Sequence, residues 1–255
     1  MSDTSRFREE IRTPSYLCGP DDRVGIDGVA SMLQEMAWQH AGMLGFAFTE
    51  EDQAYFWVLY RVRMRFHRRP RWNQRVAMTT WPSGMHRLYA IRDLRIDDAT
   101  IGGSEPERLV DISSAWIILD AENRRPVRPE RMLDADVIVD DHLLELPTGR
   151  LESIAAEEAS GRLAQARWHP VRPSDTDRNE HVNNARFAQW LLDGASRTVS
   201  GLTDCTLTFQ REMKIGEEFC VIEDPERGIA EVWRRGNTSS TSDPECACRL
   251  HVVER

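Results

Sequence analysis

The segment 173–187, PSDTDRNEHVNNARF, organises the interpretation of the whole chain. It places a carboxylate, a carboxamide and an imidazole at alternate positions, so in an extended or loosely turned segment Asp177, Asn179 and His181 would point to one side. The apolar residues that follow have the spacing of a helix packed on a core: Phe187, Trp190, Leu191, Gly194 and Ala195. The polar triplet is therefore predicted where the chain enters a buried helix, near its free N–H groups and positive dipole end.

Length and composition indicate a globular protein with a sizeable core. The chain has 255 residues, of which 40% are hydrophobic, and its longest apolar runs, at 54–60 and 115–119, are strand-sized. A net charge of −9 argues against non-specific binding of nucleic acid. Residues 1–13 are polar and of mixed charge, and the five cysteines form no CxxC pair, so we expect a cytoplasmic protein without disulfides.

Arginines crowd one short region, and two interpretations of them remain open. They are Arg61, Arg63, Arg65, Arg68, Arg69, Arg71 and Arg75. A solvated strand face is the interpretation that we favour from the sequence. The alternative is a docking patch for an acidic partner, because guanidinium groups suit phosphate and carboxylate.

The first half of the chain predicts a short strand, a long helix and a run of strands. The helix begins near Asp27 and ends at Gly45, with Leu33, Met36, Ala37, His40 and Leu44 on its buried face. Strands are expected at 16–24, 54–67, 75–81, 88–96 and 109–119, with a turn at 82–84 and a Gly-Gly-Ser loop at 102–104. In the second of these strands Arg61, Arg63 and Arg65 alternate with apolar residues, which predicts one wet face.

The same order recurs after a proline-rich and acid-rich connection at 122–160, which could carry a helix or two. A strand is expected at 163–171, a helix at 183–198, and strands at 206–213, 217–223, 228–234 and 245–253. Superposing the two helical stripes indicates an internal duplication with an offset of 154, since Leu33 then meets Phe187. This register places Arg23, Gly25 and Asp27 opposite the polar triplet, and none of them can do the same chemistry.

A long helix wrapped by an antiparallel sheet resembles the hotdog fold, and the pair resembles a double hotdog of the α+β class. Asp177-Arg-Asn179-Glu-His181-Val-Asn-Asn, followed by an aromatic residue and Trp190, is similar to the signature of acyl-acyl-carrier-protein thioesterases of plant plastids and bacteria. Further matches follow in order: Val24-Gly-Ile-Asp27, Met32-Leu-Gln-Glu35 with His40, Trp81, and Phe209-Gln-Arg-Glu212. The resemblance implies an amino-terminal repeat at 1–125 with the acyl-chain pocket and a degenerate site, a linker at 126–160, and a catalytic repeat at 161–255.

The resemblance also implies the chemistry, which is hydrolysis of an acyl-carrier-protein thioester to release free fatty acid. It assigns the catalytic roles to Asp177, Asn179, His181 and Glu212, and the helix N-terminus near 182–184 would donate N–H groups to the oxyanion. Plant members have a cysteine after the glutamate. Here Met213 cannot act as a thiolate and nothing places Cys205 at the site, so attack by carboxylate-activated water remains, with Glu212 or Asp177 as the base.

The family also suggests how the substrate is held. Leu33 and Met36 would line the acyl chain, and Arg63 and Arg65 would meet an acidic carrier protein whose phosphopantetheine arm bears that chain. We expect no cofactor and no metal. A double hotdog already contains its pseudo-dimer, although its sheet edges could still pair with a second chain to form a homodimer.

Several other interpretations compete with the resemblance. Spacing alone favours a capping and turn cluster over catalysis at 177–181, and the resemblance reverses that preference. A calcium loop fails because Glu180 and Arg186 stand where glycine and glutamate are needed, and His169, Cys246 and Cys248 fit no tetrahedral metal set. Asn237-Thr-Ser is a formal glycosylation sequon. Functional alternatives are an acyl-CoA thioesterase, a hotdog β-hydroxyacyl dehydratase and a non-catalytic acyl-binding module.

Overall fold

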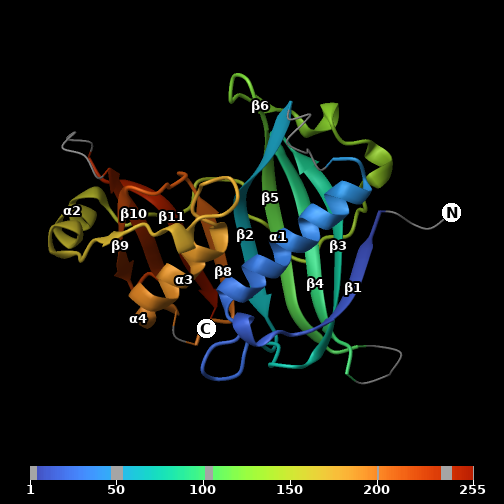
Figure 1. The fold of residues 1–255 in the computed structure, drawn as a ribbon, viewed down its shortest axis with the longest axis horizontal. Coiled ribbons are helices and arrows are strands. Elements are labelled where there is room, and N and C mark those ends of the chain that lie inside the picture. The colour runs from blue at the N-terminus through green and yellow to red at the C-terminus, as the bar shows by residue number, and fades with distance from the viewer. Residues whose placement is uncertain (1–4, 47–53, 101–105, 200, 237–242, 255) are drawn as a thin grey trace. The chain divides into compact units, whose positions relative to one another are not determined.

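The computed structural model describes residues 5–46, 54–100, 106–199, 201–236 and 243–254. Contacts divide the chain into two compact units, Met1–Leu146 and Pro147–Arg255. The predicted Gly-Gly-Ser loop at 102–104 and the sequon at 237–239 lie outside the described residues. Each unit is a helix on an antiparallel sheet (Figure 1).

The first unit contains one long helix and a sheet in the order β1-β3-β4-β5-β2, with β6 paired to β5. The elements are β1 (Phe7–Arg12), α1 (Ile26–Met43), β2 (Tyr55–Phe66), β3 (Arg75–His86), β4 (Tyr89–Asp98), β5 (Arg108–Asp120) and β6 (Pro126–Val127), with 3-10 turns η1 (Ser15–Leu17), η3 (Pro129–Arg131) and η4 (Ala135–Val137). All of these strand pairs are antiparallel.

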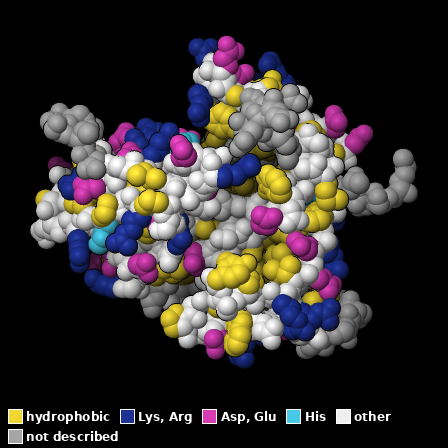
Figure 2. Space-filling model, in the orientation of Figure 1, with side chains coloured by type: hydrophobic (Ala, Val, Ile, Leu, Met, Phe, Trp, Pro, Cys, Tyr) yellow, Lys and Arg dark blue, Asp and Glu magenta, His cyan; other side chains and the backbone are white. Residues whose placement is uncertain are grey.

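Helix α1 confirms the predicted stripe and the predicted end. Leu33, Met36 and His40 are fully buried. At the C-terminus, Gly45 has a φ of 78°, its N–H donates to Gly42, and the Phe46 N–H donates to Ala41 over 2.7 Å. This pair of bonds is a Schellman cap, which requires the left-handed conformation that glycine adopts without strain. Apolar side chains also gather over α1 on its outer side (Figure 2).

The second unit repeats the helix and the four main strands. Its sheet order is β8-β11-β10-β9-β7, which matches β2-β5-β4-β3-β1 of the first unit strand for strand. The elements are α2 (Ala156–Gln165), β7 (His169–Pro170), η5 (Pro173–Asp175), α3 (Asn184–Gly194), α4 (Ser196–Val199), β8 (Asp204–Phe209), β9 (Glu217–Asp224), β10 (Ile229–Gly236) and β11 (Glu245–Glu254). The predicted internal duplication is therefore confirmed at the level of topology.

The two faces of the second sheet are covered by different segments. On one face, the Trp190 ring of α3 stacks on Phe219 of β9 with centroids 3.6 Å apart. On the other face, Ile222 and Ile229 pack in one buried cluster with Ile154 and Ala159, from α2 and the residues before it. Successive side chains of a strand alternate between faces, so β9 contacts α3 on one face and α2 on the other.

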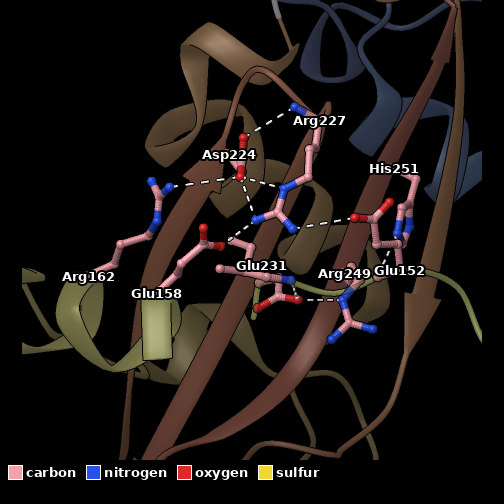
Figure 3. A network of polar contacts seen from close by, with 9 residues as sticks. Glu152, Glu158, Arg162, Asp224, Arg227, Glu231, Arg249 and His251 are labelled. Carbon is pink, nitrogen blue, oxygen red and sulfur yellow. Dashed lines mark hydrogen bonds and ion pairs between the residues drawn. The ribbon is translucent and has the colours of Figure 1, made fainter. Parts of the chain in front are cut away.

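A polar network reinforces the face under α2 (Figure 3). Arg227 binds Glu158 of α2 at 2.5 Å and Asp224 at 2.6 Å. Glu231 is completely buried and pairs with Arg249 at 2.5 Å, and its Oε1 also accepts the Ile154 N–H. A buried carboxylate needs such partners because it has lost its water. The network thus ties the 152–165 segment to β9, β10 and β11.

Three sequence predictions are wrong, each at a short or irregular element. The segment 16–24 is a 3-10 turn and loop, and the opening strand is β1 at 7–12. The turn expected at 82–84 is a bulge inside β3, and the chain reverses after His86, where Arg87 has a φ of 56°. Residues 163–165 end α2, whose Ala- and Glu-rich sequence favours helix, leaving β7 as a two-residue strand.

Three further predictions need adjustment. The strand expected at 206–213 ends at Phe209 as β8, so Glu212 and Met213 lie in the segment that follows the strand. Arg61 does not lie on a wet face: it is 1% exposed, and its guanidinium lies over the Tyr60 ring, 5.0 Å from the centroid. The helix expected at 183–198 is broken after Gly194, where Ala195 leaves helical geometry.

The contact between α3 and β9 gives a stability prediction. A Cβ added to Gly194 would lie 2.7 Å from the Val221 Cβ, so Gly194→Ala should lower the free energy of unfolding by about 1–3 kcal/mol, measured by urea titration. Gly161 in α2 has nothing within 4 Å of such a Cβ and is the matched control. Gly161→Ala should raise stability by about 0.5–1 kcal/mol, and equal effects of the two substitutions would contradict this packing.

Candidate active site

The segment 176–182 forms a closed turn at the start of α3. Thr176 and Val182 form an antiparallel bridge, and the Asp177 N–H donates to the His181 carbonyl over 2.8 Å. The Glu180 N–H donates back to the Asp177 carbonyl, and Glu180 has a φ of 61°. The triplet is thus arranged by a tight turn and not by strand alternation.

Asp177 holds this turn with its side chain. Its Oδ1 accepts the backbone N–H of Asn179 over 2.8 Å, which is the Asx-turn arrangement. Asp177 is partly buried, whereas Asn179 is exposed. One carboxylate oxygen of Asp177 is therefore committed to local structure, as the capping interpretation predicts.

A second segment, between β8 and β9, brings Glu212 to the turn. The Val182 N–H donates to the Met213 carbonyl over 2.8 Å, and His181 forms an antiparallel bridge with Lys214. As a result, His181 Nδ1 lies 3.6 Å from Glu212 Oε2, an ion-pair distance longer than a normal hydrogen bond. The side chains are 23% and 48% exposed, so solvent reaches both. The structure places this pair together although 31 positions separate the two residues (212 minus 181).

The helix N-terminus is arranged differently from the prediction. Helix α3 begins at Asn184, and the Asn183 side chain caps it by accepting the Ala185 N–H over 2.9 Å. The N–H groups of Val182 and Asn183 already donate to the carbonyls of Met213 and Asp175. The expectation that they would bind an oxyanion is therefore wrong at these two positions.

The first unit contains the same turn, which corrects the register of the duplication. The bridge between Cys18 and Val24 corresponds to that between Thr176 and Val182, and 176 minus 18 equals 182 minus 24, an offset of 158. Backbone bonds from Gly19 to Arg23 and from Asp22 to Gly19 repeat those from Asp177 to His181 and from Glu180 to Asp177, and Asp22 shares the positive φ of Glu180. The predicted offset of 154 is thus wrong by about one helical turn.

The corrected register changes which residues occupy the first turn. Gly19, Asp21 and Arg23 stand at the positions of Asp177, Asn179 and His181. Arg23 bridges Arg71 as His181 bridges Lys214, which places Arg69 at the position of Glu212. Arg69 pairs with Asp21 at 2.7 Å and donates to the Val24 carbonyl over 2.8 Å, so an ion pair closes this turn.

The cysteines provide no nucleophile at the site. Met213, next to Glu212, is fully buried, and so is Cys205 on β8. Burial raises the pKa of Cys220 and of Cys246 to about 12, which keeps both as thiols at neutral pH. All five cysteines are free, and within the described residues no group of three or more His, Cys, Asp or Glu side chains could hold a metal ion.

The predicted substrate-binding residues belong to the first unit. Leu33 and Met36 lie on the fully buried face of α1. Arg63 and Arg65 are partly exposed on β2, and Arg63 donates to the Glu145 carbonyl over 2.9 Å.

One contributor to the site has no signature in the sequence. Arg234 on β10 donates to the main-chain carbonyl of Glu212 over 2.9 Å. An arginine at the end of an alternating strand is unremarkable by pattern, and sequence reasoning missed it.

The fold and the tandem units define the class of protein, a double hotdog. The family model for the acyl-ACP thioesterase N-terminal domain matches residues 4–134, and that for the C-terminal domain matches residues 160–253. The chain therefore belongs to the acyl-ACP thioesterase family.

Curated relatives are plant proteins of this family. The chain is 29% identical over 230 residues to an acyl-[acyl-carrier-protein] hydrolase of Cuphea viscosissima, with 83% of this chain and 53% of the relative covered. It is 28% identical over 229 residues to a palmitoyl-acyl carrier protein thioesterase of Cuphea hookeriana, covering 83% and 52%. The chain thus spans about half the length of these two relatives.

Solved structures share the fold over nearly the whole chain. An acyl-ACP thioesterase from Bacteroides thetaiotaomicron has a TM-score of 0.75 at 20% identity, with 98% of each chain covered. A 12:0-ACP thioesterase from Umbellularia californica has a TM-score of 0.73 at 20% identity, covering 96% of this chain and 95% of that one. The predicted hotdog architecture is confirmed. Within the described ranges, no helix has the length and apolarity needed to cross a bilayer.

The different duties of the two carboxylates give a stability prediction. Asp177→Ala should lower the free energy of unfolding by about 1 kcal/mol because the Asn179 N–H loses its acceptor, whereas Asp177→Asn retains that acceptor. Glu212→Ala should change stability by less than about 0.5 kcal/mol, since its side chain is half exposed. Urea titration of the three variants measures this, and a larger loss in Glu212→Ala than in Asp177→Ala would contradict the assignment.

Proposed function

We propose that this chain hydrolyses the thioester of acyl-acyl-carrier-protein and releases free fatty acid. The observation that carries the proposal is the approach of His181 Nδ1 to Glu212 Oε2, which lie 3.6 Å apart and are both accessible to solvent. Family membership supports the reaction type. A thioester carbonyl is already activated, so the protein has to orient a water, remove its proton and stabilise the oxyanion.

Glu212 is the general base of this proposal. Its carboxylate is 48% exposed, so a water molecule can reach it, and His181 lies beside it. Asp177 is less suited to the role because its Oδ1 already accepts the Asn179 N–H. We assign Asp177 to holding the turn that presents the neighbouring groups.

His181 and Asn179 complete the site. The imidazole next to Glu212 orients the attacking water and the carboxylate. Because the N–H groups of Val182 and Asn183 are already bonded, the oxyanion needs another donor. The exposed carboxamide of Asn179 is the group that we assign to it, as amide side chains serve in other oxyanion holes.

The two units would then have different roles. The second unit carries the reacting groups, and the first, whose equivalent turn is closed by Arg69 and Asp21, carries the acyl chain. Leu33 and Met36 are fully buried on α1, so the acyl chain would meet them only inside the first unit. The expected setting is fatty acid synthesis in the cytoplasm, and the five free cysteines support a reducing compartment.

Replacing the base gives the first functional test. Glu212→Gln should lower the rate of thioester hydrolysis by about 100-fold or more, because the amide cannot accept a proton from water. The rate is measured as thiol release from an acyl-carrier-protein substrate. The matched control is Glu218→Gln, whose partner is Arg235. A folded Glu212→Gln variant with a near-normal rate would remove Glu212 from the mechanism.

The carrier is tested by charge reversal. Arg63→Glu with Arg65→Glu should reduce kcat/KM for the acyl-carrier-protein substrate by roughly tenfold or more and leave the acyl-CoA ester nearly unaffected, since only the carrier presents an extended acidic surface. Arg87→Glu, at the exposed turn after β3, is the single-site control for charge reversal away from β2. An equal loss of kcat/KM on both substrates would contradict the carrier assignment and leave an acyl-CoA thioesterase as the alternative.

A further inference from the structure

The segment that carries Glu212 is fixed by one arginine from a neighbouring strand. Arg234 Nη1 donates to the main-chain carbonyl of Glu212 over 2.9 Å and to Glu217 Oε1 over 3.0 Å. Its Nη2 donates to Glu245 Oε2 over 2.7 Å. The side chain is 26% exposed. A guanidinium can serve three acceptors at once because its five donors lie in a rigid plane.

Glu217 and Glu245, the two carboxylates that Arg234 binds, also contact other residues near Glu212. The second oxygen of Glu217, Oε2, accepts the backbone N–H of Lys214 over 2.7 Å. Glu245 also pairs with Arg211 at 3.6 Å, on the other side of Glu212. The main chain is therefore fixed at Glu212 directly and at Lys214 through Glu217, while Glu245 pairs with the side chain of Arg211.

The first unit has a residue of opposite charge, Asp98, at the strand position equivalent to Arg234. On the paired strands, Arg234 is opposite Phe219 and Asp98 is opposite Val76. Phe219 lies two residues after Glu217, and Val76 lies two residues after Gln74, so Gln74 is the equivalent of Glu217. There Gln74 Oε1 accepts the Arg71 N–H over 2.8 Å, as Glu217 does for Lys214.

Asp98 completes the comparison. It accepts from Gln74 over 2.6 Å and from Arg68 over 2.9 Å. The carboxylate of Asp98 thus contacts the arginine-rich loop of the first unit, and the guanidinium of Arg234 contacts the loop of the second unit that carries Glu212.

We propose that Arg234 is a positioning residue for the hydrolysis, which fixes the main chain at Glu212 so that its carboxylate stays beside His181. This inference rests on the proposed function, since it concerns the same site. The exposed side chain of Glu212 has rotational freedom of its own. Fixing its peptide keeps the point from which the side chain extends in place beside His181, and displacements of about 1 Å can cost as much as 100-fold in rate.

The contact with Arg234 also has a consequence for the titration of Glu245. The hydrogen bond from Arg234 is the main cause that lowers the pKa of the Glu245 carboxyl below its ordinary value. In Arg234→Met this pKa should return toward the ordinary value, and carboxyl titration by NMR measures it without any assay of activity.

The kinetic test compares Arg234→Met, Arg234→Lys and the control Arg235→Met. Arg235 is the next residue on β10, where it pairs with Glu218 and lies over the Trp168 ring. Arg234→Met should lower kcat by roughly 10- to 100-fold and change KM by less than about twofold. Arg234→Lys keeps the charge but cannot span the three acceptors, so it should recover part of the loss. Arg235→Met should match the wild type.

A second background separates positioning from general damage. In Glu212→Gln, which lacks the base, adding Arg234→Met should lower kcat by less than about twofold, because the group it positions is already gone. Two results would overturn the role of Arg234 and leave the proposed function intact. One is an unchanged kcat when Arg234→Met is made in an active wild-type chain. The other is a loss of kcat in the Glu212→Gln background as large as that in the wild type. A wild-type chain without hydrolysis would overturn the proposed function and this role with it.

Discussion

One backbone hydrogen bond, from the Val182 N–H to the Met213 carbonyl, sets the geometry on which the candidate site depends. It joins the turn before α3 to the segment between β8 and β9, and the adjoining bridge between His181 and Lys214 continues the pairing. With the two segments in this register, the imidazole of His181 and the carboxylate of Glu212 extend to neighbouring positions. The helix cap at Asn183 and the packing of Trp190 on Phe219 hold the turn to the sheet.

The duplication shows that this backbone geometry does not by itself make a reactive site. The first unit builds the same turn, bridges and loop, yet it places Arg23 and Arg69 where the second unit has His181 and Glu212. Arg69 turns inward to Asp21 and to backbone carbonyls, so the position that could hold a base instead stabilises the loop. Under the proposed function, the side chains decide which copy reacts. Asp98 and Arg234 have opposite charges because Asp98 pairs with Arg68, whereas Arg234 pairs with Glu217.

Sequence periodicity predicted the long elements and missed the short ones. The helix with Leu33 and Met36, and the long strands of both units, were predictable because burial repeats over several turns or pleats. Periodicity does not register a bulge or a positive φ, so the run of β3 past Pro82 and the left-handed Glu180 escaped it. The register of the duplication failed by about one turn for the same reason, since a helix repeats its stripe at each turn. Residue types at 177, 179, 181 and 212 indicated the candidate site through family resemblance, whereas the contact from Arg234 depends on strand pairing that no local pattern encodes.

The role proposed for the pair of Glu212 and His181 is hydrolysis of a carrier-bound acyl thioester. The most direct measurement incubates the chain with a panel of acyl-carrier-protein substrates of different chain lengths, β-hydroxyacyl forms included, and follows both free thiol and lipid products by mass spectrometry. We expect free thiol and free fatty acid in equal amounts, with repeated turnover. An enoyl product without free thiol would identify a dehydratase, and bound lipid without turnover would identify an acyl-binding module; either result would contradict the account.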